Sequence, residues 1–175
     1  REGGRVLLTR YPAPRFGRRS LGVLDVALPV VHGTNVEDGA LQGFFRTLSL
    51  PFAGPEVLPS AIGMDKFVMK TLFRERGLPV LDCVRFDSKR FMRESRAVLD
   101  EIEQKIGYPA IVKPVDLGSS VGISVAPDRE ALEAAIEDGF SFAPVLIAER
   151  AVQNLRELNC AVLGDYESAR ASECE

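Results

Sequence analysis

The 175-residue sequence has few cysteines, no long apolar run and no strong excess of charge of either sign. Its three cysteines are odd in number and show no C-x-x-C spacing, so neither a disulfide framework nor a zinc site is indicated, and we expect a reducing, cytoplasmic compartment. No apolar run approaches the roughly 20 residues needed to cross a bilayer, so we expect no membrane association. A net charge of −3 argues against a general nucleic-acid-binding surface.

Two familiar phosphate-binding motifs are also missing. No glycine is followed by G-K-[ST] at the spacing of a Walker A loop, and the glycine-rich run 117–122 opens a strand rather than the helix of a dinucleotide fingerprint. What the sequence does have is 46% hydrophobic residues, enough for a substantial core in one or two domains.

The run from Lys113 to Gly122 carries the clearest candidate for ligand binding. A short apolar strand ends on Lys113, and a second β-branched strand follows the glycines, so we expect a hairpin with a small, flexible tip. Because Gly118 and Gly122 have no Cβ, the backbone can turn its N–H groups toward an anion, and the hydroxyls of Ser119 and Ser120 add donors. An ordinary glycine-rich hairpin with a solvated lysine is the alternative.

The first 62 residues predict the end of a doubly wound α/β domain. The apolar run 23–31 is typical of a parallel strand covered on both faces, and a helix is expected over 40–48. The run ends at His32, the only histidine, at the kind of strand end where open α/β sheets bind ligands. A structural hydrogen bond is the alternative role for this histidine.

Residues 1–19 carry six arginines. A basic patch for an anionic partner is one interpretation. The proline and glycine residues among them favour a solvated connecting loop instead.

From about residue 63 the pattern changes to a small α+β layer, with a boundary near 61–65. We expect helices over 65–76, 88–106 and 128–137, and strands over 80–86, 108–112, 121–125, 145–148 and 155–163. Lys66 falls in the first turn of a helix, where a cation is unfavourable against the helix dipole, which suggests an anionic contact there. A solvated surface lysine is the alternative.

Several short motifs follow one another at a spacing that carries a family resemblance. In chain order, the motifs are His32-Gly33 together with residues 37–39, residues 64–66, residues 111–114, residues 117–124, and residues 156–158 together with 161–164. In this order they resemble the D-alanine:D-alanine ligases, members of the ATP-grasp superfamily; the first 22 residues match loosely. The resemblance implies that ATP phosphorylates the carboxylate of one D-alanine and that the amine of a second D-alanine then displaces phosphate, for peptidoglycan synthesis.

The same resemblance implies roles in nucleotide binding. Lys66 and Lys113 would contact the ATP phosphates, and a loop would close over the β and γ phosphates. The loop consists of Gly118, Ser119, Ser120, Val121 and Gly122. Glu149, Arg150 and Val152 would lie against the adenine, and Glu157 would bind the ribose hydroxyls. His32 and Ser119 would lie near the first D-alanine, with Glu37 supporting His32.

The resemblance also implies a domain organisation. Residues 1–62 would be part of the N-terminal domain, 63–165 the central ATP-grasp domain, and 166–175 the start of a C-terminal domain. We expect a chain cut at both ends, with the Mg²⁺ or Mn²⁺ ligands beyond residue 175, no ligase activity in these residues alone, and a homodimer as the full-length protein. Open alternatives are another carboxylate-amine ligase, one using D-lactate or D-serine, or a non-catalytic ATP-binding remnant.

Overall fold

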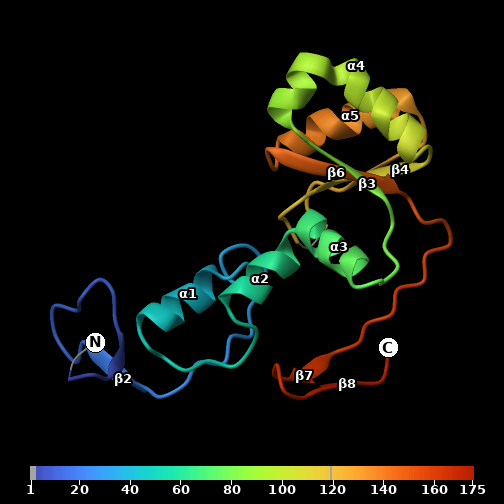
Figure 1. Ribbon diagram of the computed structural model, residues 1–175. Helices are drawn as coiled ribbons and strands as arrows, with labels where there is room; N and C mark the ends of the chain where they lie inside the picture. Colours follow the sequence, from blue (N-terminus) through green and yellow to red (C-terminus); the bar gives the residue numbers. More distant parts are fainter. Residues whose placement is uncertain (1–2, 119) are drawn as a thin grey trace.

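The computed structural model describes residues 3–118 and 120–175. Its strands are β1 (Val6–Thr9), β2 (Ser20–Leu24), β3 (Cys83–Asp87), β4 (Ala110–Pro114), β5 (Ser124–Ala126), β6 (Val145–Arg150), β7 (Val162–Gly164) and β8 (Ala169–Ala171). Its helices are α1 (Ala40–Thr47), α2 (Val57–Met64), α3 (Lys66–Glu75), α4 (Ser88–Lys105) and α5 (Arg129–Phe140). Figure 1 shows the β1–β2 hairpin at one end, α1 and α2 in the middle, and strands β3, β4 and β6 with helices α4 and α5 at the other end.

The four-stranded sheet β3-β6-β4-β5 is the largest sheet among the described residues, and all its neighbouring strands pair antiparallel. Helices α4 and α5 cover one face (Figure 1). Alternate strand residues point to that face and form the core with the two helices, among them Phe86, Val112 and Leu146. The expected order of strands and helices from β3 to β6 is confirmed.

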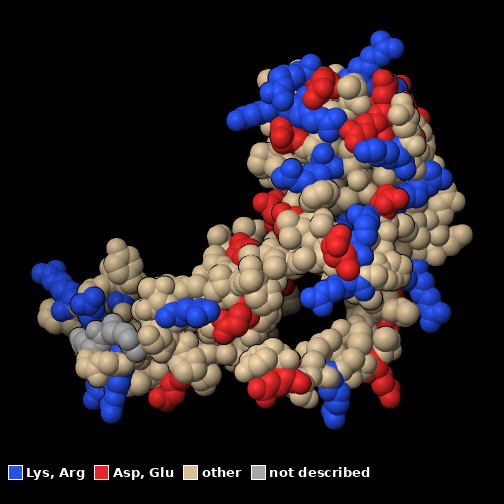
Figure 2. Space-filling model, viewed as in Figure 1, with Lys and Arg blue, Asp and Glu red and all other residues tan. Residues whose placement is uncertain are grey.

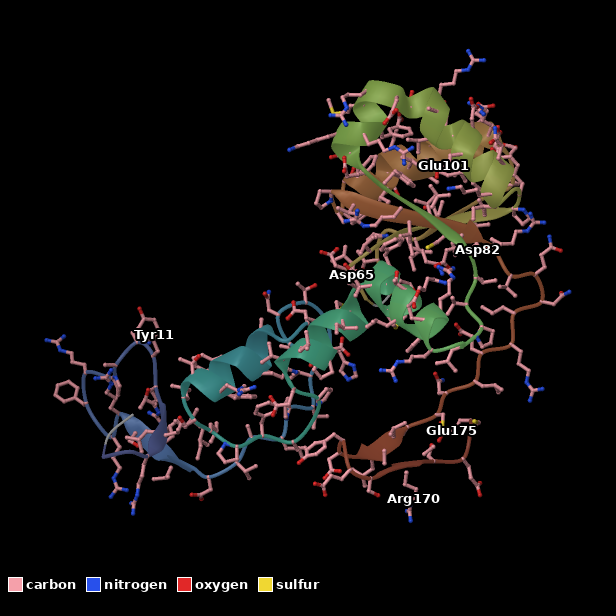
Figure 3. The ribbon with its side chains drawn as sticks, in the orientation of Figure 1. Tyr11, Asp65, Asp82, Glu101, Arg170 and Glu175 are labelled. Atoms are coloured by element: carbon pink, nitrogen blue, oxygen red, sulfur yellow. The ribbon has the colours of Figure 1, made fainter. Side chains whose placement is uncertain are left out.

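Aspartates begin three of the helices. The carboxylates of Asp65, Asp87 and Asp128 each accept a hydrogen bond from backbone N–H groups in the first turn of α3, α4 and α5. Figure 3 labels Asp65 where α3 starts, below the sheet. These caps fix where α3 begins and therefore where Lys66 lies.

The opposite face of the sheet carries ionisable groups. The register places Cys83 of β3 beside Glu149 of β6, and Ile147 of β6 beside Lys113 of β4. Helix α3 lies against this face, because its Lys70 pairs with Glu149. One face of the sheet is therefore an apolar core, and the other is built to hold charge.

Two predicted strands are wrong. Only β2 and a single bridge from Ala27 to Phe52 form over the apolar run 23–31, and Leu28 and Val30 are 73% and 78% exposed. A strand of this kind needs pairing along its edges and packing layers on both faces, whereas Leu28 and Val30 are exposed and, among the described residues, Ala27 has only the Phe52 bridge. Similarly, of the alternating run 155–163 only the last residues form a strand, the short β7, and the residues before it are exposed.

The arginine-rich start is a solvated hairpin. The backbone N–H of Arg10 donates to the carbonyl of Arg19 at 2.9 Å, closing an exposed loop between β1 and β2. Figure 2 shows basic side chains at this end, whereas both signs are interspersed around the four-stranded sheet. Across the described residues, no helix is both long and apolar enough to cross a membrane.

Candidate functional site

A buried carboxylate held by two lysines lies on the open face of the sheet. Glu149 is 3% exposed, and Lys113 donates to its Oε2 at 3.0 Å. Lys70 Nζ lies 3.0 Å from the other oxygen, Oε1. The two lysine side chains are 13% exposed at Lys70 and 24% exposed at Lys113. With two cations around one anion, this lysine–glutamate cluster carries a net positive charge, which suits an anionic ligand.

Local structure explains how the cluster forms. Lys113 pairs across the sheet with Ile147, so Glu149 lies one alternate position along β6 on the same face. Lys70 reaches the carboxylate from α3 and also donates to the carbonyl of Leu81 at 3.2 Å. The contact between Lys70 Nζ and Glu149 Oε1 is an ion pair without hydrogen-bond geometry. Among the described residues, this oxygen accepts no hydrogen bond.

Lys66 holds the segment that leads into the glycine-rich loop. Its ammonium donates to the carbonyl oxygens of Pro114 at 3.0 Å, of Val115 at 3.4 Å, and of Leu117. Burial lowers the pKa of Lys66, and repulsion from the nearby Lys113 ammonium lowers it further. The two lysines therefore lie on a shared side of the sheet, as the proposed phosphate contact requires.

A cavity of about 710 Å³ lies beside Lys66. It is also lined by His32, Glu37, Leu117 and Gly118. Glu37 Oε2 accepts a hydrogen bond from the backbone N–H of Gly33. Glu37 thus fixes the backbone next to His32, and no hydrogen bond joins these two side chains in the described part of the chain.

Packing explains one of the two glycines in the glycine-rich loop. Gly122 has φ +67°, and a Cβ there would lie 2.9 Å from Pro114 Cγ and 3.0 Å from the Phe142 ring. Packing alone therefore requires this glycine. A Cβ on Gly118 would meet nothing within 4 Å, so room for an anion beside its backbone is compatible with the structure. Ser120 has φ +59°, Val121 is exposed, and the predicted Ser119 lies outside the described residues.

Replacing Gly122 with alanine should lower the free energy of unfolding by about 2 kcal/mol, because the left-handed backbone and the contact with Phe142 both resist a Cβ. The matched control is Gly118→Ala, which has open space and should leave stability within about 0.5 kcal/mol of the parent. Chemical denaturation measures both. Equal midpoints for the two variants would contradict the packing explanation.

The remaining predicted residues lie after or at the end of β6. Arg150 Nη1 donates to the carbonyl of Ile106 at 3.1 Å, which ties it to the end of α4. Val152 and Glu157 lie on an exposed segment, and no described side-chain hydrogen bond joins them to the lysine–glutamate cluster. The structure thus brings together Lys66, Lys113 and Glu149 on one side, and His32, Glu37 and Gly118 around the cavity.

Lys70 is the residue that sequence reasoning missed. A signal was available, because Lys66 and Lys70 are four residues apart and so lie on one side of a helix. The spacing alone does not reveal the buried carboxylate between them and the sheet.

Comparisons with known proteins agree on one family. The family model described as "D-ala D-ala ligase C-terminus" matches residues 72–175. The D-alanine–D-alanine ligases of Heliobacterium modesticaldum and Bacillus velezensis are each 42% identical over 160 residues, which is 91% of this chain. These 160 residues make up 41% and 45% of the two relatives, so the chain spans less than half the length of either.

Solved structures give the same result. The D-alanine-D-alanine ligase from Coxiella burnetii superposes with a TM-score of 0.80 and 34% identity, covering 90% of this chain and 45% of that one. The VanG D-Ala:D-Ser ligase from Enterococcus faecalis superposes with a TM-score of 0.77 and 36% identity, covering 86% and 42%. The mixed α/β class with small sheets is therefore confirmed.

Proposed function

The chain belongs to the D-alanine–D-alanine ligase family, and on that premise we propose that it carries the ATP-binding part of an enzyme that ligates two D-alanines. One structural observation supports the proposal most. A net cationic cluster and Lys66 lie on one face of an antiparallel sheet, at the base of a glycine-rich hairpin. Catalysis of phosphoryl transfer rests mainly on positioning and on neutralising phosphate charge, which such a face provides.

The proposed chemistry follows from the substrate. A carboxylate is a poor electrophile, so ATP first transfers its terminal phosphoryl group to the carboxylate oxygen of one D-alanine, giving an acyl phosphate and ADP. The amine of the second D-alanine attacks the acyl carbon, and phosphate leaves with the C–O bond electrons. In this scheme His32 and Ser119 lie near the first D-alanine, and Glu37 supports His32. The cavity lined by His32 and Glu37 supports that placement.

Lys113 changes partner in this proposal. Without nucleotide it donates to Glu149, and with ATP bound it turns toward the phosphates. A buried carboxylate left alone is costly, but Glu149 keeps its ion pair with Lys70. The second lysine therefore allows the first to leave without exposing an uncompensated charge in the protein interior.

The finer assignments belong to the same proposal. The loop of Gly118 to Gly122 covers the β and γ phosphates. The end of β6 and the segment after it contact adenine through Glu149, Arg150 and Val152, and Glu157 binds ribose. The N-terminal domain comprises residues 1–62, the central ATP-grasp domain residues 63–165, and the C-terminal domain starts at residue 166. This last boundary falls within the β7–β8 hairpin, which would then join the two domains.

In the same proposal the enzyme is a cytoplasmic homodimer that acts in peptidoglycan precursor synthesis. We propose no metal site within this chain. Among the described residues, no group of His, Cys, Asp and Glu side chains is arranged to hold Mg²⁺ or Mn²⁺.

ATP should protect Lys66 and Lys113 from an amine-acylating reagent. Because burial lowers its pKa, Lys66 has a larger unprotonated fraction than an ordinary lysine at a mildly alkaline pH, so the reagent should modify it when no nucleotide is present. Bound phosphates cover both ammonium groups and slow their modification, which peptide mass spectrometry measures. Lys105, 61% exposed on α4, is the matched control whose rate should not change. Equal rates for Lys66 with and without saturating ATP would contradict the phosphate contact.

The activity itself is tested on the complete product of the gene, in parallel with the 175-residue chain. With D-alanine, ATP and Mg²⁺, the expected products are ADP, phosphate and D-alanyl-D-alanine, detected by mass spectrometry. ATP binding without any turnover by the complete product would instead identify a non-catalytic nucleotide-binding protein.

The likeness to VanG favours one second candidate, a ligase with a different second substrate. A panel of D-alanine, D-serine and D-lactate, each supplied with D-alanine and ATP, separates the possibilities by the mass of the product. We expect D-alanyl-D-alanine to form fastest, because both curated relatives compared here are D-alanine–D-alanine ligases. Faster formation of the D-serine product would favour the second candidate.

A further inference from the structure

The end of the chain pairs with the segment before β7, beyond the ends of the named strands. Asn159 and Glu175 exchange two backbone hydrogen bonds, with N–H to O distances of 3.1 and 3.0 Å. This mutual exchange defines a hydrogen-bonded pair of an antiparallel ladder. Next to this pair, toward the β7–β8 hairpin, Cys160 lies on one strand and Cys174 on the other.

The pairing is continuous with the β7–β8 hairpin. The backbone N–H of Ser172 donates to the carbonyl of Ala161 at 2.8 Å, and Val162 pairs with Ala171. One residue, Cys160, lies between Asn159 and Ala161 on the first strand, whereas two residues, Glu173 and Cys174, lie between Ser172 and Glu175 on the second. The extra residue makes this a β-bulge. The bulge leaves Cys160 facing the Glu173-Cys174 step. Figure 3 labels Arg170 and Glu175 on this same C-terminal segment.

The two thiols are accessible and separate from the third. Cys160 and Cys174 are free and exposed, and Cys160 Sγ lies 3.3 Å from the carbonyl oxygen of Ser172 on the opposite strand. Disulfides form between residues whose Cα atoms are about 4.4–6.8 Å apart, a range that includes a cross-strand pair of this kind. Cys83 is half-buried on the four-stranded sheet and has no cysteine as its cross-strand partner.

We propose that Cys160 and Cys174 form a redox-active dithiol that closes into a disulfide across this segment. The oxidant is a small disulfide such as oxidised glutathione. One protein thiolate attacks it and releases one small thiol, and the second protein thiolate then displaces the other from the mixed disulfide. Two protein thiols thus lose two electrons and two protons, and the small disulfide is reduced to two thiols. A reducing compartment keeps the two thiols reduced, so formation of the disulfide indicates oxidising conditions.

The disulfide would link the segment before β7, through Cys160, to the segment after β8, through Cys174. It therefore fixes the entry to the β7–β8 hairpin without involving the lysine–glutamate cluster. The proposal does not depend on the function proposed above, and its test needs no nucleotide or D-alanine.

The test equilibrates the full chain in glutathione buffers of increasing oxidised fraction, traps free thiols with a maleimide and locates the modifications by peptide mass spectrometry. Because the two thiols are held together, the internal disulfide should exceed the mixed glutathione adduct on either cysteine on the order of tenfold. Cys83 should remain free of the bond, so Cys83→Ser, the matched control, should give the same product.

Two variants make the result decisive. In Cys160→Ser and in Cys174→Ser, the remaining exposed cysteine should accumulate the glutathione adduct, because no second thiol can displace it. Unchanged circular dichroism shows that each serine variant is folded. If the parent chain accumulates adducts on both cysteines as fast as these variants do, or forms disulfide-linked dimers in place of the internal bond, the proposal is overturned.

Discussion

Replacing Lys113 with methionine should reduce kcat/KM for ATP-dependent ligation by the complete gene product by about 100-fold or more. Methionine keeps much of the side-chain length and removes the ammonium that we propose for the phosphates. Folding should survive, because Glu149 retains Lys70 as its counter-ion. A coupled assay of ADP release at varied ATP concentration measures the change, and circular dichroism confirms the fold.

The control for this prediction is Lys105→Met. Lys105 is an exposed lysine that also pairs with a glutamate, at 2.6 Å, but on the helical side of the sheet. Its loss should leave kcat/KM within about twofold of the parent, since exposed ion pairs contribute little. If Lys113→Met retains activity close to that of Lys105→Met, Lys113 does not bind the phosphates.

Replacing Glu149 with glutamine should lower the free energy of unfolding by about 3 kcal/mol, since it leaves Lys70 and Lys113 facing each other without a shared anion. Glutamine has nearly the same shape as glutamate, so the loss of stability measures the effect of removing the negative charge. Added salt should restore part of the stability, because both lysines are partly reached by solvent. Urea denaturation at low and high salt provides both numbers.

Glu101→Gln is the matched control for burial. Glu101 also accepts from two cations, Arg90 at 2.8 Å and Lys105 at 2.6 Å, but it is 25% exposed. Its replacement should cost no more than about 1 kcal/mol. Equal costs for the two glutamates would mean that the charge of Glu149 is screened in the folded protein, and the proposed role of Lys70 would then be rejected.

What the sequence predicted correctly was mostly local. Helices α3, α4 and α5 begin at aspartates and show helical spacing of apolar residues, signals that act within a few residues of the chain. The hairpin of β4 and β5 was predictable for the same reason. The position of Lys113 directly before the loop followed from these elements, whereas the hydrogen bonds of Lys66 to the carbonyls of Pro114 and Leu117 join segments distant in the chain.

The errors concern partners that are distant in the chain. An apolar run such as 23–31 becomes a strand only if other segments pair with it, and Ala27 has one bridge, to Phe52. The ion pair of Lys70 with Glu149 joins residues on α3 and β6, and no periodicity reveals it. Gly122 was correctly singled out, but the neighbours that require glycine there, Pro114 and Phe142, are contacts of the folded chain.

The most direct test of the central claim is a crystal structure of the complete gene product with Mg²⁺ and a non-hydrolysable ATP analogue. The account predicts that Lys113 Nζ leaves Glu149 and, with Lys66 Nζ, lies within hydrogen-bonding distance of phosphate oxygens, while Lys70 stays beside Glu149. A nucleotide bound elsewhere, with Lys113 still 3.0 Å from Glu149 as it is here, would contradict it.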